Sequence, residues 1–190
     1  MTIRFAAIAL VVCLALSPGP ARAAQIDAIV AAIEHDAIAL STLEAYRQAY
    51  APEQPPAVAL QQLIDDQLLA REANRYGQTV TNDQVKAAIA KQPRPGTLTQ
   101  LEWENLAASH LLAQRFLDFR FGDFVPVSRD EVRAYYEAHR DRFPQAFDAV
   151  EEDIRQLLVP VVRARRISAY KDELRVRYDV RVNGFLLPAE

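Results

Sequence analysis

The residues of this sequence that most readily do chemistry are three histidines and one pair of adjacent carboxylates. His35, His110 and His139 fall in three separate segments, and none has a metal-ligating partner three or four positions away. The sequence therefore predicts no metal site with local ligand spacing. Asp65 and Asp66 are neighbours, so on a helix their side chains diverge by about 100°. This favours two surface acids over a catalytic pair.

Other catalytic motifs are absent too. The sequence contains no G-x-S-x-G nucleophile elbow, no phosphate-binding loop with a G-K-[ST] ending and no G-x-G-x-x-G. We therefore expect no catalytic residue, no metal and no cofactor. An enzyme whose catalytic residues are scattered along the chain is the alternative that this argument leaves open.

The first 23 residues have the pattern of a secretory signal peptide. Arg4 precedes an apolar run, Phe5–Leu16, which is too short to span a bilayer comfortably, and Ala21-Arg22-Ala23 is an A-x-A cleavage site. We expect cleavage after Ala23 and a periplasmic or secreted product, 24–190, that forms a single domain. An uncleaved N-terminal anchor is the alternative.

Cleavage at this site changes the composition of the product. It removes Cys13, the only cysteine, and it removes two arginines, which takes the net charge from -3 to -5. A chain without thiols forms no disulfide and no Cys-metal site. Its acidic balance argues against nucleic acid as a partner. No later segment is apolar for long enough to span a membrane, so we expect a product that is not membrane-spanning.

A long helix, Ala57–Gly77, is expected to organise the fold. Two prolines precede it and Gly77 suits its C-terminal cap. Its apolar residues lie on two sides, which predicts a helix wedged between partners. Before it, Ile26–Ile33 and Ala37–Leu40 flank a polar turn and predict a β-hairpin, with a helix as competitor. The tail Asp179–Phe185 alternates like a strand, and its simplest partner is that hairpin.

Four capping-box sequences mark the starts of further helices. They begin at Ser41, Thr81, Thr99 and Ser128, each with Glu or Gln three positions on. A last helix runs from about Ala146 to Arg177. Its arginines interleave with acids, which predicts a solvated, paired helix face; they are Arg163, Arg165, Arg166, Arg175 and Arg177. The fold class is therefore mainly α, a compact multi-helix domain with a small hairpin and possible C-terminal strand.

The helix after Thr99 carries its large apolar residues in two stripes. The first is Leu101, Leu112, Phe116 and Phe119, and the second is Trp103, Leu106, His110, Leu117 and Phe121. One stripe should face the core. The other is either a second core contact or an exposed strip for a partner. His110 lies within an apolar stripe, and we interpret it as a satisfied core histidine.

Several of these segments resemble the chaperone domain of SurA-like periplasmic proteins. Asp27–Leu40 followed by S-x-x-E resembles the family's entry hairpin and helix. LIDDQLLAREANRYG with TVTNDQV, within Ala59–Val85, resembles its central segment. VSRDEVRAYYEAHRDRF resembles the helix that leads into a parvulin-type prolyl isomerase module, and FDAVEEDIRQLL the helix that follows it. Here only Pro144-Gln145-Ala146 separates those two segments, so the isomerase module is missing.

The resemblance implies a holdase-type chaperone without isomerase activity, with unfolded secreted or outer-membrane polypeptides as clients. Such a protein needs an accessible apolar strip with a charged rim. We expect the client contacts to be among seven residues: Trp103, Leu106, Phe116, Phe119, Phe121, Tyr135 and Tyr136. The alternative is a non-enzymatic adaptor or structural subunit that binds one dedicated envelope partner. The sequence leaves open a homodimer formed through the terminal helix.

Overall fold

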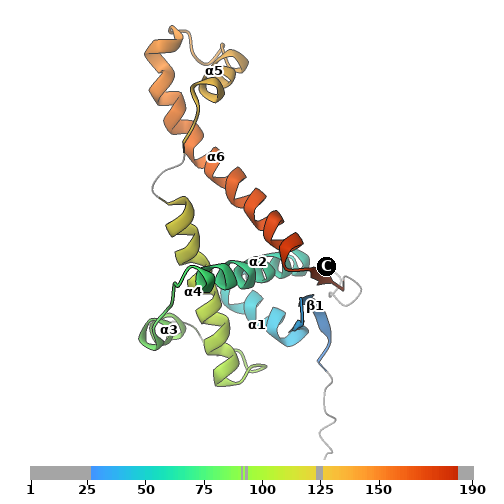
Figure 1. The fold of residues 1–190 in the computed structure, drawn as a ribbon. Coiled ribbons are helices and arrows are strands. Elements are labelled where there is room, and N and C mark those ends of the chain that lie inside the picture. The colour runs from blue at the N-terminus through green and yellow to red at the C-terminus, as the bar shows by residue number, and fades with distance from the viewer. Residues whose placement is uncertain (1–26, 91, 93, 123–125, 184–190) are drawn as a thin grey trace, which may run out of the picture.

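The computed structural model describes residues 27–90, 92, 94–122 and 126–183, so the predicted signal peptide lies outside the described part. The expected mainly helical class with a small antiparallel sheet is confirmed (Figure 1). In chain order the elements are β1 (Ile29–Ile33), β2 (Asp36–Ala39), α1 (Leu40–Tyr50), α2 (Pro56–Arg75), α3 (Asn82–Ile89), α4 (Gln100–Phe121), α5 (Arg129–Ala138), α6 (Phe147–Arg177) and β3 (Val180–Val182).

The sheet joins the two ends of the described chain. Its order is β2-β1-β3, and β1 is antiparallel to both neighbours. The predicted hairpin and the predicted tail strand are both confirmed. Glu34 takes the left-handed conformation at the hairpin turn, with φ of 55°. Central pairing gives β1 hydrogen bonds on both edges, and three of its residues, Val30, Ala31 and Ile33, are fully buried.

The helix α2 lies in the middle of the main core, as predicted. It contacts α1, α4 and α6, and its buried residues face more than one side. Its end is a Schellman motif, because Gln78 N–H donates to Ala73 O at 2.9 Å and Gly77 N–H to Asn74 O at 3.0 Å. Gly77 supplies the required positive φ, 71°. The apolar residues of α2 therefore determine its central position, and Gly77 determines where it ends.

Three of the four predicted capping boxes are confirmed, at Thr81, Thr99 and Ser128. The fourth is wrong. The helix α1 begins at Leu40, so Ser41 is already inside it. Ser41 instead donates its backbone N–H to Asp27 at 3.1 Å, and its hydroxyl also donates to that carboxylate. The physical reason is that β2 leads into α1 without a loop, and Asp27 takes over the capping role from a distant position.

The buried apolar residues form two clusters instead of one. The larger cluster lies around the sheet, α1, α2 and α4, together with the C-terminal part of α6. The smaller one joins α5 to the first half of α6, through Val132, Tyr136, Phe147 and Ile154 among others. Packing around α2 therefore accounts only for the first cluster. The cause is the length of α6, 31 residues, whose first half projects from the body with α5 beside it (Figure 1).

Two buried carboxylates of α2 hold α6 against the body. Asp65 contacts Lys171 Nζ at 3.2 Å and Arg175 Nη2 at 2.5 Å. Glu72 accepts hydrogen bonds from Tyr170 and Tyr178 and pairs with Arg75. The prediction that Asp65 is a surface acid is wrong, because the basic end of α6 provides the charges that make its burial tolerable.

The arginines of α6 also pair with acids of other helices. Arg175 and Arg177 bind acids within α6, as predicted, but they also bind Asp65 and Glu72 of α2. Arg163 pairs with Asp118 of α4, and Arg165 pairs with Glu131 of α5. The predicted paired helix face thus combines ion pairs within α6 with ion pairs to three other helices.

Candidate functional site

The outer face of α4 exposes large apolar side chains at both of its ends. Leu101 is 66% exposed and Phe119 is 63% exposed. They are about five helical turns apart and therefore on the same face of the helix. Leu112 lies on this face between them and is buried. The face is thus apolar at two separated points, with a covered middle.

An aromatic patch, Tyr76 and Phe119, occupies one end of this face. Tyr76 is 54% exposed, and its ring centroid lies 6.4 Å from that of Phe119. Both rings also pack on buried Phe116, at 5.6 and 6.4 Å. Phe116 therefore fixes the two exposed rings in place, which leaves a rigid apolar surface open to solvent.

A groove between α3 and α4 lies at the other end. It has a volume of about 310 Å³. Its lining combines apolar side chains with two amides and two opposite charges: Val85, Leu101 and Ala108, then Asn82 and Asn105, then Lys86 and Glu104. Side-chain amides both donate and accept hydrogen bonds, so they suit the backbone of an extended peptide. The apolar lining suits one of its side chains.

Arg115 separates the groove from the aromatic patch and fixes α3 in position. Its guanidinium donates to the carbonyl of Thr79 and, at 3.2 Å, to Gln84 Oε1. Gln84 also completes the capping box of α3 by accepting from Thr81 N–H at 3.0 Å. The same contacts therefore start α3 and hold it on α4, which creates the groove.

The structure divides the seven predicted client contacts. Phe119 is exposed, and Phe121 and Tyr135 are half-buried. The other four lie in the hydrophobic cores: Trp103, Leu106, Phe116 and Tyr136. In this conformation these four stabilise the fold and are not accessible to a client. Of the two predicted stripes, the second turns mainly inward, and the exposed apolar side chains belong to the first.

Sequence reasoning missed two residues of this surface. Leu101 belongs to a predicted stripe but not to the predicted client contacts, and Tyr76 lies within the predicted helix Ala57–Gly77 but not among those contacts. A signal existed for Tyr76, since it directly precedes Gly77, where the helix ends. An aromatic side chain at a helix end has fewer neighbours to cover it.

Asp66 and His110 form the arrangement in the protein that most resembles a catalytic dyad. Asp66 Oδ2 lies 2.6 Å from His110 Nδ1 and accepts a hydrogen bond from the Tyr46 hydroxyl at 2.8 Å. The other ring nitrogen is 2.8 Å from the amide of Gln114, and the ring stacks on Tyr50 at 4.0 Å. Both nitrogens thus have partners, which agrees with the predicted satisfied histidine. Asp66 is not the predicted surface acid.

The tyrosines around this dyad titrate far from their usual range. Burial, reinforced by the Asp66 carboxylate, raises the pKa of Tyr50 to about 12. Burial and the hydrogen bond to Asp66 raise the pKa of Tyr46 further. Both hydroxyls therefore stay protonated at neutral pH. The Tyr46 hydroxyl donates to Asp66 and so joins α1 to α2, whereas Tyr50 contributes its ring to the contact with His110.

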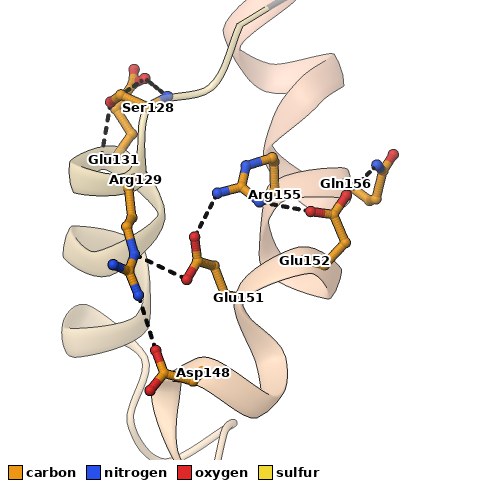
Figure 2. A network of polar contacts seen from close by, with 8 residues as sticks. All are labelled: Ser128, Arg129, Glu131, Asp148, Glu151, Glu152, Arg155 and Gln156. Atoms are coloured by element: carbon orange, nitrogen blue, oxygen red, sulfur yellow. Dashed lines mark hydrogen bonds and ion pairs between the residues drawn. The ribbon is translucent and has the colours of Figure 1, made fainter.

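A network of opposite charges covers the junction of α5 and α6 (Figure 2). Arg129 of α5 pairs with Asp148 and Glu151 of α6, both at 3.0 Å, and Arg155 pairs with Glu151 and Glu152. Glu151 and Arg155 are half-buried, and their partners Arg129, Asp148 and Glu152 are exposed. The network therefore forms a structural rim for the smaller core. Across the described residues no group of three or more His, Cys, Asp or Glu is placed to hold a metal ion.

Comparison with known proteins adds no relative: the sequence matches no protein-family model and no curated protein. Among the helices of the described ranges, none combines the length and hydropathy needed to cross a membrane.

Proposed function

We propose that this protein is a periplasmic holdase-type chaperone that binds unfolded secreted or outer-membrane polypeptides and has no prolyl isomerase activity. The observation that carries the proposal is the outer face of α4, where exposed Leu101 and Phe119 stand at the ends of one helix face. The resemblance to SurA-like proteins supports the same class. The exposed part of the surface differs from the expected one, since it is centred on Tyr76, Leu101 and Phe119.

The geometry of this face suggests what a client looks like. The 18 positions from Leu101 to Phe119 span about 27 Å along the helix. An extended chain covers that distance with about eight residues. A client segment with an aromatic or large aliphatic residue at each end of such a stretch would place one side chain in the groove and the other on the aromatic patch. The Asn82 and Asn105 amides would hold the backbone near the groove.

The second candidate is an adaptor that binds one folded envelope partner. The rigidity of the aromatic patch favours it, because Tyr76 and Phe119 are fixed on Phe116 and present one shape. The two candidates differ in selectivity. A chaperone binds many unfolded chains weakly, whereas an adaptor binds one surface tightly.

The experiment is a light-scattering assay of aggregation with the chain that follows the predicted cleavage site. A reduced model protein and an unfolded outer-membrane protein serve as clients. Suppression of both at about equimolar ratio supports the holdase. A folded chain, verified by circular dichroism, that suppresses neither at several-fold excess excludes a general holdase. Capture of one dominant envelope protein would then favour the adaptor.

A further inference from the structure

The middle of α6 carries a stripe of apolar and small side chains that no part of the described chain covers. We define it as Leu157, Val161, Ala164 and Ser168. The spacing of four, three and four residues places them on one face of the helix. Leu157 is 49% exposed and Val161 is 58% exposed, and the two smaller residues are exposed as well. Before the stripe, the first half of α6 packs against α5. After the stripe, the C-terminal part of α6 packs against the body.

A hollow of about 350 Å³ adjoins the C-terminal part of the stripe. Ala164 and Ser168 line it because their side chains are short, and Ile167 provides an apolar wall. Asp65, Lys171 and Arg175 form its polar side. One face of α6 therefore carries two projecting side chains, Leu157 and Val161, followed by a recess.

From this pattern we infer that two copies of the chain associate through antiparallel α6 helices. A two-fold axis between residues 162 and 163 places Leu157 of each copy opposite Ser168 of the other. The same axis places Val161 opposite Ala164. Each leucine then enters the hollow of the second copy. The two-fold axis repeats this contact, so both leucines and both hollows are used. An isologous contact requires this kind of self-complementary patch.

The charges beside the stripe agree with the antiparallel arrangement. Asp153 and Lys171 lie on the same flank of the stripe, and the two-fold axis brings Asp153 of one copy next to Lys171 of the other. Lys171 contacts Asp65 at 3.2 Å within its own chain. An ammonium has three donors, so it can bind a second carboxylate as well.

Helix geometry permits the contact. Packed helices of this kind approach to about 8–10 Å between axes, and small residues at the contact favour the lower end of that range. The first half of α6 projects from the body together with α5 (Figure 1), so the antiparallel pairing lays this projection along the second copy. The contact therefore extends past the stripe itself.

Sedimentation equilibrium of the chain that follows Ala23 tests the dimer. We expect the mass of two chains at high concentration and a Val161→Glu variant whose dissociation constant is raised at least about tenfold. The matched control is Val176→Glu, which adds the same charge to α6 at an 85% exposed valine away from the stripe. It should dimerise like the wild type. A monomer mass up to about 0.5 mM in the wild type, or equal behaviour of the two variants, would overturn the inference.

Disulfide trapping tests the register independently, because Cys13 lies in the predicted signal peptide and the remaining chain has no thiol. Ala164→Cys lies close to the two-fold axis and should form a cross-linked dimer under mild oxidation. Ala169→Cys is exposed but off the stripe, and it should not. Cross-linking of both variants to the same extent would refute the register. If instead Val161→Glu reduces client capture by a monomeric wild type, the stripe is a client site and the dimer is excluded.

Discussion

The hydroxyl of Tyr170 donates a hydrogen bond of 2.9 Å to the buried carboxylate of Glu72, a residue 98 positions earlier in the chain. Tyr178 donates to the same carboxylate at 2.7 Å, and Arg75 and Arg177 are within 2.5 and 3.3 Å of it. Four groups thus converge on one side chain that is almost entirely buried. Together with Asp65, this carboxylate provides the buried polar contacts between α2 and the end of α6.

Replacing Glu72 by glutamine should therefore destabilise the protein strongly. The amide keeps the shape but loses the charge, and it puts an NH₂ group where donors already converge. Loss of one member of such a buried network costs about 3 kcal/mol, measured as the free energy of unfolding in urea. Glu173→Gln is the matched control. Glu173 pairs with Arg177 at the surface, so its loss should change stability by less than about 0.5 kcal/mol. Equal effects would show that burial of Glu72 does not matter.

The two buried acids of α2 should affect acid stability in opposite directions. Burial alone would raise the pKa of Glu72, but hydrogen bonds from Tyr178, Arg75 and Tyr170 hold it below its ordinary value. Its stabilisation is therefore present above about pH 4.5 and is lost as the pH falls through the lowered pKa. Burial raises the pKa of Asp65 despite Lys171 and Arg175. The folded chain then takes up this proton before the unfolded chain, which opposes acid unfolding.

Urea unfolding between neutral and acidic pH would measure this difference. Glu72→Gln should flatten the acid limb of the stability curve, and Asp65→Asn should make it steeper. The slope with pH, rather than the absolute stability, is compared, since both substitutions also change contacts. Slopes that change in the same direction in both variants would contradict the opposite effects that we expect for Glu72 and Asp65.

Local features of the sequence predicted most of the secondary structure. Capping boxes, the Gly77 end signal and the alternation of the hairpin act within a few residues, so one sequence suffices to find them. The error at Ser41 has a local cause of its own, because the motif is present but Asp27 competes for the same groups. The roles of Asp65, Asp66 and Glu72 depend on partners 20 to 110 positions away, which no spacing rule reveals.

The candidate site was predicted only in outline. Periodicity located two stripes on α4 but did not decide which one faces the core. That choice depends on where α1 and α2 pack, and Trp103 and Phe116 were buried by those contacts. Likewise, the second core arises because α6 extends past the body, and a helical period alone contains no information about how many partners cover it.

The smaller core should unfold on its own at a lower free energy than the body. It contains fewer buried residues, and the described chain links it to the body through α6 and ion pairs such as Arg163 with Asp118. Ile154→Ala removes a fully buried side chain there, at a cost of about 2–4 kcal/mol. Amide hydrogen exchange should then lose protection in α5 and the first half of α6 while the protection of α2 stays.

The matched substitution in the body is Leu63→Ala, which removes a fully buried leucine from α2. It should lower protection throughout the main core, including the sheet, because those residues share one cluster. A uniform loss of protection from Ile154→Ala would mean that the two clusters unfold as one cooperative unit.

Phe119 and Phe116 provide the sharpest separation of function from stability, because they are three positions apart on α4 and their rings touch. Phe119 is exposed, so Phe119→Ser should leave the free energy of unfolding within about 0.5 kcal/mol of wild type. It should reduce aggregation suppression several-fold, and combination with Tyr76→Ser should reduce it further. Phe116→Ala should cost about 3–5 kcal/mol, because that ring is fully buried. If Phe119→Ser suppresses aggregation as well as the wild type does, clients bind elsewhere and the aromatic patch is not the site.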